Sequence, residues 1–445
     1  MYAAASLALS TFFVPALTSC ESPGASPEQE AAQARLEAQA RVIEAEVSEL
    51  RGRAFLRPVD VQLADEEDFR AYVDRRFALS YGPGEFEAEE YVAKMLGLIP
   101  TGMSLWETTM ELLDAQVGGY YDPSQDAFYL MEKFDNPQLT GVILAHELTH
   151  ALDDQLYGMD ETVESLNGNG DAELAYHSVI EGSGTALMTQ WQLKKVLGGE
   201  LSMEDMGDVD LGMEAMKDLP EFLWKPLLAS YVRGQMFLNR TTNMMAAQMK
   251  APKLADIERA FKTPPSSTEQ ILHPKKYWDE EEFDAPQTVH IDSSALPVGW
   301  EVLNENTMGE LFLGMVVNPL DARDAIDPGN PMSIVGIKYT NDAAGGWDGD
   351  RYVFLGRGDE RVFHAHVVWD DEAEAEEFQA ALEAMGDHIQ GALRELAASG
   401  PGSHGWNVVR HGNQVSFTAA VVESGTGSVE SVVDSLVARV SDSTE

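Results

Sequence analysis

The sequence predicts an α+β protein: a mostly helical domain with a small sheet or hairpin beside one apolar helix, and then a smaller C-terminal α+β domain. Three observations support this fold class. Long stretches repeat their apolar residues at helical spacing, two aromatic runs joined by a turn precede an apolar helical run at 141–152, and strand and helix patterns alternate beyond Trp278. At 445 residues, the chain is long enough for two or three domains.

The first twenty residues form a separate unit. An apolar run from Ala3 to Leu17 is too short to span a membrane, and it ends at Leu17-Thr18-Ser19-Cys20. This resembles a bacterial lipoprotein signal peptide, in which the cysteine becomes the lipidated first residue, although no Lys or Arg precedes the apolar run. We therefore expect a membrane anchor on Cys20 and a location at the cell envelope, facing the periplasm or the cell exterior. The alternative is an apolar N-terminus with an incidental cysteine.

The overall charge excludes one class of partner. The chain has 30 Lys and Arg residues against 75 Asp and Glu residues, which gives a formal charge of -45. No nucleic-acid partner is expected, because phosphate contacts require Lys and Arg. A strongly acidic surface keeps a protein soluble in salt water, so we interpret the charge as adaptation to a saline setting.

The segment between the leader and residue 113 predicts mainly helices. Apolar residues recur at helical spacing over 28–51, residues 53–63 alternate as a strand does, and 65–113 contains three short helices. Gly82-Pro83-Gly84 and Pro100-Thr101-Gly102 separate these helices. We interpret the 28–51 helix as a spacer that follows a short polar tether.

Two aromatic runs predict a hairpin. Residues 117–121 and 127–131 favour strands, and the turn at 122–125 joins them. The edge of such a sheet offers unpaired N–H and C=O groups to an extended peptide. The alternative is a purely structural hairpin.

The apolar run 142–152 contains a metal-binding pattern. His146 and His150 are four residues apart, so on a helix both imidazoles share one face and can bind one ion. Glu147 can reach a metal-bound water without being a ligand. In this H-E-x-x-H arrangement, zinc lowers the pKa of the bound water to about 7 and the glutamate is the general base. The alternative is an ordinary amphipathic helix with two histidines four residues apart.

A third ligand is expected from another helix, because a catalytic zinc ion typically has three protein ligands and a water. The next helical run starts at Asp171. Its candidates on one face are Glu173, His177 and Glu181. We favour Glu181, because Ile180 buries it and because Gly182 and Gly184 allow close packing against the first helix.

Several nearby residues have weaker patterns. His177 suits either a supporting contact to a ligand or a place in the core. Asp153 and Asp154 follow His150 on the same helix and would orient a ligand or cap a turn. The polar alternation at 167–171 is interpreted as a loop and helix cap rather than a calcium site.

These motifs resemble a known family. The run 146–155 (HELTHALDDQ), followed by 179–182 (VIEG), is similar to a family of uncharacterised bacterial and archaeal lipoprotein-type proteins that are regarded as neutral zinc metallopeptidases. The resemblance extends to 119–122, 231–237 and 267–274, and so covers about 53–277. As in the thermolysin-like gluzincins, it implies a zincin-like fold with Zn²⁺ held by His146, His150 and Glu181. Asp153 stands where glutamine is commoner in that family.

The gluzincin reaction also requires a hydrogen-bond donor for the tetrahedral oxyanion, usually a tyrosine hydroxyl or a histidine N–H. Tyr231 is one candidate and lies in a predicted pair of buried helices at 220–250. His273 is the other and ends a short helix that a capping box of Ser266 and Glu269 would start. A structural role is the alternative for each.

The C-terminal part predicts strands and helices in alternation. Strands are expected at 351–355 and 362–369, and helices at 371–396 and 428–440. His364 and His366 share one face of a strand, a spacing that can bind metal. Because no third ligand is evident, we interpret this pair as cross-strand packing.

These features divide the chain into five segments. They are a lipoprotein signal peptide at 1–20, a tether and spacer helix at 21–52, a zincin-like metallopeptidase domain at 53–277, an acidic linker at 278–297 and a C-terminal α+β domain at 298–445. We predict a lipid-anchored zinc peptidase that acts on peptide or protein substrates. One alternative is a non-catalytic envelope lipoprotein that uses the scaffold as a binding or structural module, and another is a zinc amidase that acts on cell-wall links. Glu147 argues against a structural site, which needs no base and is usually closed by a fourth protein ligand.

Overall fold

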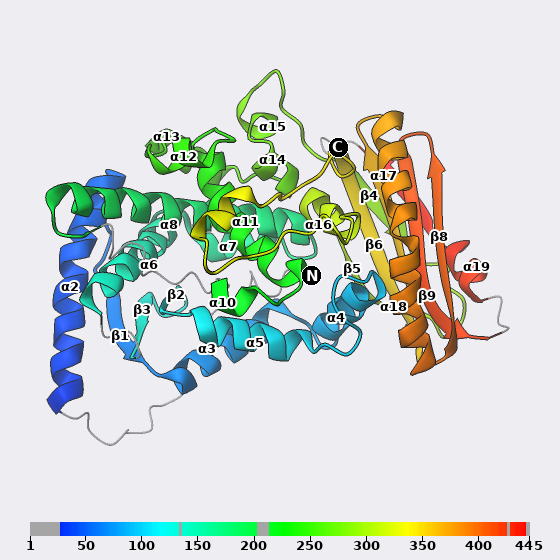
Figure 1. The fold of residues 1–445 in the computed structure, drawn as a ribbon, viewed down its shortest axis with the longest axis horizontal. Coiled ribbons are helices and arrows are strands. Elements are labelled where there is room, and N and C mark those ends of the chain that lie inside the picture. The colour runs from blue at the N-terminus through cyan, green and yellow to red at the C-terminus, as the bar shows by residue number, and fades with distance from the viewer. Residues whose placement is uncertain (1–26, 133–135, 203–212, 425–427, 442–445) are drawn as a thin grey trace.

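The computed structural model describes residues 27–132, 136–202, 213–424 and 428–441. It has an α+β fold, as predicted: helices make up most of the first two thirds of the chain, and a five-stranded sheet dominates the last third (Figure 1). The expected lipidation site, Cys20, lies outside the described residues. Within those four ranges, every helix is too short or too polar to cross a membrane.

The first helix, α2 (Pro27–Arg51), is part of the core rather than a solvated spacer. Its buried residues follow a helical stripe: Leu36, Ala40, Ile43, Val47 and Arg51. The apolar members of this stripe pack in one cluster with Leu144 and Leu148 of α6 (Pro137–Tyr157). The sequence alone gave no partner for this stripe, because the partner is a helix almost a hundred residues further along the chain.

The helices and hairpin of the N-terminal part form as predicted. The helices are α3 (Glu66–Ser80), α4 (Glu85–Met95) and α5 (Leu105–Gln116). The strands are β1 (Asp60–Ala64), β2 (Gly119–Asp122) and β3 (Ala127–Met131), and β1 is shorter than the strand expected at 53–63. They form one sheet in the order β1-β3-β2, with β1 parallel and β2 antiparallel to β3. Strand β2 is therefore an edge strand.

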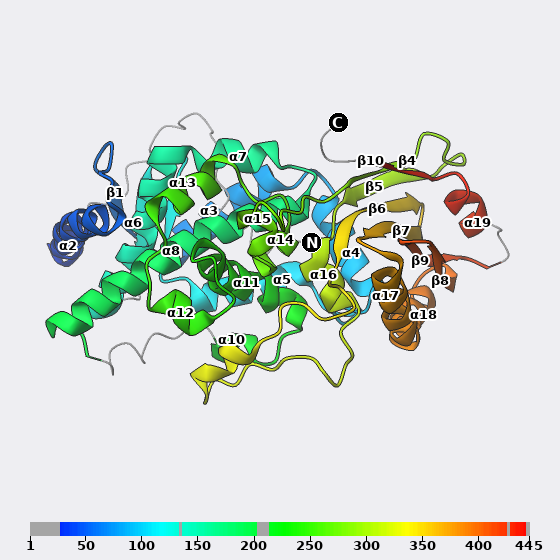
Figure 2. The same cartoon turned by 90° about the horizontal axis from the view of Figure 1, so that it is seen from above.

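A group of helices occupies the middle of the molecule (Figure 2). Its members after α6 are α7 (Met159–Ser165), α8 (Gly170–Gly198), α10 (Met213–Met216), α11 (Glu221–Leu238), α12 (Met244–Gln248), α13 (Leu254–Lys262), α14 (Thr268–Leu272) and α15 (Lys275–Trp278). The predicted helix pair at 220–250 is thus one long helix and one short helix. Helix α14 is capped by Ser267, whose side chain accepts from Gln270 N, one residue later than the capping box expected at Ser266 and Glu269.

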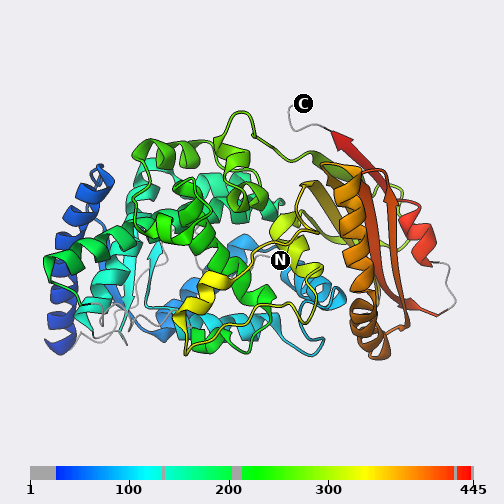
Figure 3. The same ribbon diagram turned by 45° about the horizontal axis from the view of Figure 1, so that its top comes forward.

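The C-terminal part is built on an antiparallel sheet in the order β5-β6-β7-β9-β8, and α17 and α18 pack beside it (Figure 3). Its strands are β5 (Glu301–Asn306), β6 (Trp347–Arg357), β7 (Glu360–Trp369), β8 (Gly402–His411) and β9 (Gln414–Glu423). Its helices are α16 (Gly309–Val316), α17 (Glu372–Ala384), α18 (Gly386–Ala398) and α19 (Ser428–Val433), with a 3₁₀ turn at Pro331–Gly336. The helix expected at 371–396 is therefore divided in two at Met385.

The helix expected at 428–440 is wrong in its second half. Helix α19 ends at Val433, and β10 (Val437–Ser441) pairs antiparallel with β4 (Thr288–Asp292). The sequence pattern missed this strand because β4, its partner, lies within the interval 278–297 that was assigned to a linker. A strand is stable only when another strand completes its hydrogen bonds.

The two large parts of the molecule share one hydrophobic core. Phe222 of α11 and Phe312 of α16 meet edge to face, with ring centroids 5.6 Å apart. Tyr91 of α4 packs against Phe354 of β6 at 5.7 Å. All but the half-buried Tyr91 belong to a single buried cluster that runs from α3 to β9, and Tyr91 packs against it. The metal-site helices and the C-terminal sheet are therefore packed together.

Candidate metal centre

The first two predicted ligands lie on α6, at a point where the helix is buried on almost every side. Leu144, Ala145 and Leu148 have almost no exposed surface. A helix that is apolar all round is a core helix, so polar residues within it require partners. His146 and His150 are 8% and 2% exposed, and their rings meet edge to face with centroids 4.5 Å apart.

Helix α8 places Glu181 against this pair. Glu181 Oε2 lies 3.0 Å from His146 Nε2 and 3.6 Å from His150 Nε2, and the two Nε2 atoms are 3.0 Å apart. Glu181 is 2% exposed. Burial opposes ionisation, but His150 and His146 outweigh it and hold the pKa of this carboxyl well below its usual value. The structure therefore brings together the three residues predicted to be ligands.

The donor set fits zinc in type and in spacing. Ligands at about 2.1 Å from a tetrahedral zinc ion lie about 3.4 Å from one another, close to the separations of these three atoms. Two imidazoles and one carboxylate are also a ligand set that catalytic zinc sites use. In the described part of the chain, only these three His, Cys, Asp or Glu residues gather at this point, so a tetrahedral ion would keep one open position.

Glycine at position 184 is required for this approach of α8 to α6. A Cβ atom there would lie 2.8 Å from Cε1 of both His146 and His150, which is closer than Cβ atoms in proteins approach other heavy atoms. The prediction for Gly184 is therefore confirmed. Gly182 was expected to pack against the same helix, but it faces α11 instead, where a Cβ would lie 2.2 Å from the carbonyl carbon of Gly234. Two glycines thus set two different helix crossings.

Glu147 lies where a general base is expected. It is half-buried, and its Oε2 accepts a hydrogen bond of 3.1 Å from the backbone N–H of Tyr121 on β2. Burial raises the pKa of Glu147, and the opposing effect of His150 and His146 does not cancel the rise. The hairpin predicted beside the metal-binding helix therefore contacts the predicted base directly.

Tyr231 of α11 completes the site on its third side. Its ring stacks on His146, with centroids 5.7 Å apart and an interplanar angle of 18°. Burial, together with the charge of Glu181, raises the pKa of its hydroxyl well above the usual value, so that the group stays protonated. A tyrosine O–H thus lies beside the ligand set, as the first of the two predicted oxyanion donors would.

His273 does not join this group. Its Nε2 lies 2.9 Å from Glu310 Oε1 of α16, and its side chain is 41% exposed. No hydrogen bond or ion pair joins His273 to the three ligands in the described structure. The oxyanion role expected for His273 therefore lacks geometric support, and the residue links α14 to the C-terminal part. The pattern was misleading because α14 packs on α16, which sequence periodicity does not show.

The neighbouring polar residues have structural partners. Asp153 Oδ2 accepts hydrogen bonds from Arg51 of α2 at 2.8 Å and from Ser183 of α8 at 2.5 Å. Asp154 accepts from the Met159 N–H at the start of α7 and from the Tyr121 hydroxyl. Asp153 thus ties three helices together behind the histidines. Sequence analysis missed Arg51 and Ser183, although Ser183 lies between the two glycines of the crossing.

The remaining candidates in this region are structural. His177 is buried, and its Nε2 lies 3.7 Å from Glu173 Oε1. Neither ring nitrogen forms a hydrogen bond within the described structure, so His177 does not support a metal ligand. Asn169 caps α8 by accepting from Ala172 N, as expected for a loop and cap. On β7, His364 and His366 bond to Thr418 and Ser416 of β9, which confirms cross-strand packing.

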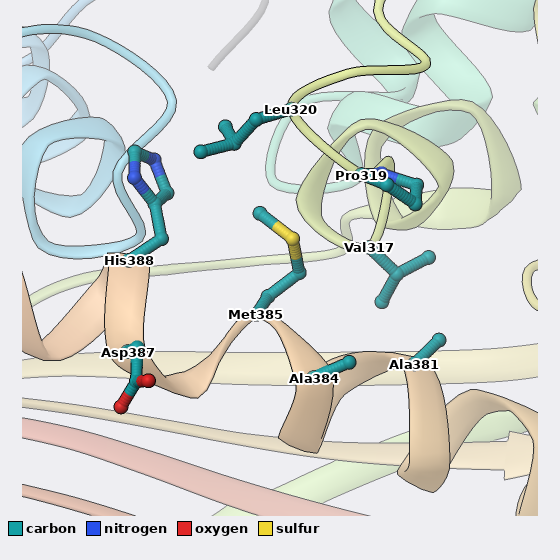
Figure 4. A pocket seen from close by; sticks show the side chains of 8 residues that line it. All are labelled: Val317, Pro319, Leu320, Ala381, Ala384, Met385, Asp387 and His388. Carbon is teal, nitrogen blue, oxygen red and sulfur yellow. The ribbon is translucent and has the colours of Figure 1, made fainter.

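Two other features lie away from the metal centre. Glu269, Asp284 and Asp370 come together, but Lys276 lies between them and forms an ion pair with each. A cavity of about 340 Å³ lies between α17, α18 and the segment after α16 (Figure 4). Its lining is mostly apolar: Val317, Pro319, Leu320, Ala381, Ala384, Met385, Asp387 and His388. None of the metal-centre residues lines it.

Comparison with known proteins gives a match for one part of the chain. Residues 298–433 match a family described as "Domain of unknown function (DUF8575)". This stretch runs from β5 to α19 and contains none of the residues of the metal centre. No curated protein and no solved structure matches the chain.

Proposed function

We propose that this protein is a zinc-dependent peptidase of the gluzincin type. The observation that carries the proposal is the buried set of His146, His150 and Glu181, whose donor atoms lie 3.0 to 3.6 Å apart beside Glu147. The gluzincin-like motifs of the sequence support the same reaction. The lipid anchor on Cys20 and the location at the cell envelope belong to this proposal as well.

The roles of the chain's own residues follow from their positions. Zinc bound to the three ligands would supply Lewis acidity and lower the pKa of a bound water to about 7. Glu147 would serve as the general base for that water, and the Tyr121 N–H, which donates to Oε2, holds its carboxylate in place. Tyr231 donates a hydrogen bond from its hydroxyl to the oxyanion that forms from the peptide carbonyl.

Strand β2 supports a peptide as the substrate. Met131 N donates to Gly118 O, so by the antiparallel alternation the N–H and C=O groups of Gly119 and Tyr121 point away from β3. One of these outward groups, Tyr121 N–H, already contacts Glu147. An extended peptide can add to such an edge beside the base. This edge favours a peptide over a cell-wall amide.

An open coordination position favours catalysis over a structural role. Structural zinc sites are usually closed by four protein ligands, whereas this set has three in the described part of the chain. A base beside the open position would have no use in a structural site. These two features argue against the non-catalytic binding module.

The test is Glu147→Gln, which keeps the size of the side chain but removes the base. We expect the variant to retain about one zinc ion per chain, while hydrolysis of an unfolded protein falls by roughly 10²- to 10⁴-fold. Zinc is measured by plasma mass spectrometry and hydrolysis by release of labelled fragments. Glu173→Gln, two turns before Glu181 on the same helix, is the matched control and should retain both zinc and activity.

One outcome would contradict the proposed peptidase activity. Wild-type protein that binds zinc but cleaves no protein, peptide or cell-wall substrate, with Glu147→Gln indistinguishable from it, would remove the enzyme hypothesis. The binding-module alternative would then take its place.

A further inference from the structure

Three buried polar side chains lie behind the metal centre. Arg51 ends α2, and Asp153 lies three residues after His150 on α6. Ser183 lies two residues after Glu181 on α8. The exposed fractions of Arg51, Asp153 and Ser183 are 5%, 0% and 1%. Helix α2 runs beside α6 and α8 at one end of the molecule (Figure 1). The three residues thus come from three helices, two of which carry the predicted ligands.

These side chains bond to one another in a closed triangle, which we call the buried triad. Arg51 Nη2 donates to Asp153 Oδ2 at 2.8 Å and to Ser183 Oγ at 2.6 Å. Ser183 Oγ donates in turn to Asp153 Oδ2 at 2.5 Å. Hydrogen bonds to charged groups are shorter and stronger than those between neutral groups. The buried triad therefore holds α2, α6 and α8 together at this point.

Close packing alone does not set the register of α8 against α6. Gly184 lets the two helices approach, because a Cβ there would collide with both histidine rings. Apolar contacts limit the distance between helices but are non-directional, whereas a hydrogen bond has a preferred direction. The bond from Ser183 to Asp153 therefore opposes sliding of α8 along α6. Such sliding would carry Glu181 away from the histidine pair.

Asp153 also acts on the ligand of its own helix. Its carboxylate interacts electrostatically with the His150 ring. Residues that support metal ligands from behind fix the orientation of those ligands, and they are often carboxylates. The buried triad thus reaches one ligand on each helix, His150 through Asp153 and Glu181 through Ser183.

We propose that Arg51, Asp153 and Ser183 position the zinc ligands, so that the affinity of the centre for zinc depends on the buried triad. The three are positioning residues, because they act through the ligands and do not bind the ion themselves. This inference rests on the proposed metal centre, but it does not require hydrolysis. It also gives α2, which the sequence suggested to be a spacer, a part in the metal centre through its last residue.

The decisive test is Ser183→Ala, which removes one corner of the buried triad and leaves the ion pair of Arg51 and Asp153 in place. We expect the zinc dissociation constant to rise about 10- to 100-fold, the usual effect of replacing a residue that supports a ligand. Competition between the metal-free protein and a chromophoric chelator measures it. Cobalt-substituted protein gives an independent readout, since its visible absorption bands depend on ligand geometry and should change.

Ser178→Ala is the matched control. Ser178 is another buried serine of α8, 2% exposed, and its hydroxyl donates to Leu174 O of the same helix at 2.8 Å. The substitution therefore removes a hydroxyl of similar burial without touching the buried triad. We expect the zinc dissociation constant and the cobalt spectrum to remain those of the wild type.

Two substitutions of Arg51 grade the effect. Arg51→Met removes the charge and both hydrogen bonds, so it should weaken zinc binding more than Ser183→Ala does. Arg51→Lys keeps the charge without the planar fork, so it should retain part of the affinity that Arg51→Met loses. Circular dichroism checks that each variant is folded. Because Ser183→Ala keeps the ion pair, it decides the question even if Arg51→Met does not fold.

Unchanged zinc affinity in Ser183→Ala, or an equal loss in Ser178→Ala, would overturn the inference. If metal-free Ser183→Ala unfolds at a lower temperature but binds zinc as the wild type does, the buried triad only holds the helices together, and the inference is likewise wrong. None of these measurements uses a substrate. A wild type that binds zinc but cleaves nothing would remove the proposed peptidase activity and leave the role of the buried triad standing.

Discussion

Helix α6 and strand β7 each carry two histidines on one face, but the structure surrounds the two pairs differently. On α6, the carboxylate of Glu181 lies 3.0 Å from His146 Nε2. On β7, His364 and His366 lie 2.9 and 2.8 Å from the hydroxyls of Thr418 and Ser416, and His366 Nε2 also lies 3.1 Å from Gln414 Oε1. Histidine spacing alone is therefore a weak criterion for a metal site.

The surroundings also change the proton affinity of each pair. Burial lowers the proton affinity of His150, but the Glu181 carboxylate outweighs it and raises its pKa. Burial lowers the pKa of His364 to about 4, and within the described residues no carboxylate opposes this shift. A site that stabilises a proton through a carboxylate can stabilise a metal cation by the same attraction. A pair held neutral among uncharged hydroxyl and amide groups gives a cation no such stabilisation.

The largest expected difference between the pairs is in zinc content. His150→Ala should lose nearly all bound zinc, because two remaining protein ligands hold the ion poorly. His366→Ala on β7 should keep about one zinc ion per chain. Both are measured by metal analysis after dialysis against a weak chelator. Loss of zinc from His366→Ala alone would move the metal site to the sheet and reverse the comparison.

The second expected difference is in pH dependence. The pKa of His364 is about 4 when folded, against an ordinary value of 6.5, so the unfolded chain binds its proton first as the pH falls. This contribution to stability is fully present above pH 6.5 and is lost as the pH approaches 4. The loss amounts to about 3 kcal/mol at most.

His364→Gln tests this directly. We expect the free energy of unfolding to fall less between pH 7 and pH 4 in the variant than in the wild type, as measured by urea denaturation. His411→Gln, an exposed position on β8, is the control and should follow the wild type. Parallel curves for all three proteins would show that His364 is not held neutral by its burial.

The smallest expected effect concerns Gly184, which lies against the histidine pair of α6 and has no counterpart at the pair on β7. In Gly184→Ala, the new methyl group would lie 2.8 Å from both histidine rings, so α6 and α8 must separate slightly. We expect a loss of about 1–3 kcal/mol in the free energy of unfolding and weaker zinc binding. Thermal denaturation and a zinc titration measure the two effects.

A helical glycine in an open setting provides the contrast. Gly391 of α18 has no atom within 4 Å of the position of an added Cβ. Gly391→Ala should therefore raise stability by about 0.5–1 kcal/mol, because alanine loses less backbone entropy on folding. If Gly184→Ala behaved in the same way, the close packing of α8 on the histidines would be refuted.

Local patterns in the sequence determined much of the candidate site. The four-residue spacing of His146 and His150 requires a helix, the adjacent Glu147 follows the H-E-x-x-H pattern, and the turn at 122–125 predicts the hairpin. These features depend on residues close in the chain, where helical and strand periodicity govern which side chains share a face. The α+β class and most of the helices in the first half were predicted for the same reason.

The tertiary structure decided everything that depends on distant partners. It brings Glu181, rather than His177, into contact with the histidine pair, and Tyr231, rather than His273, beside His146. It also packs α2 into the core and pairs β10 with β4. Each of these contacts joins segments far apart in sequence, and local periodicity carries no information about which buried faces meet.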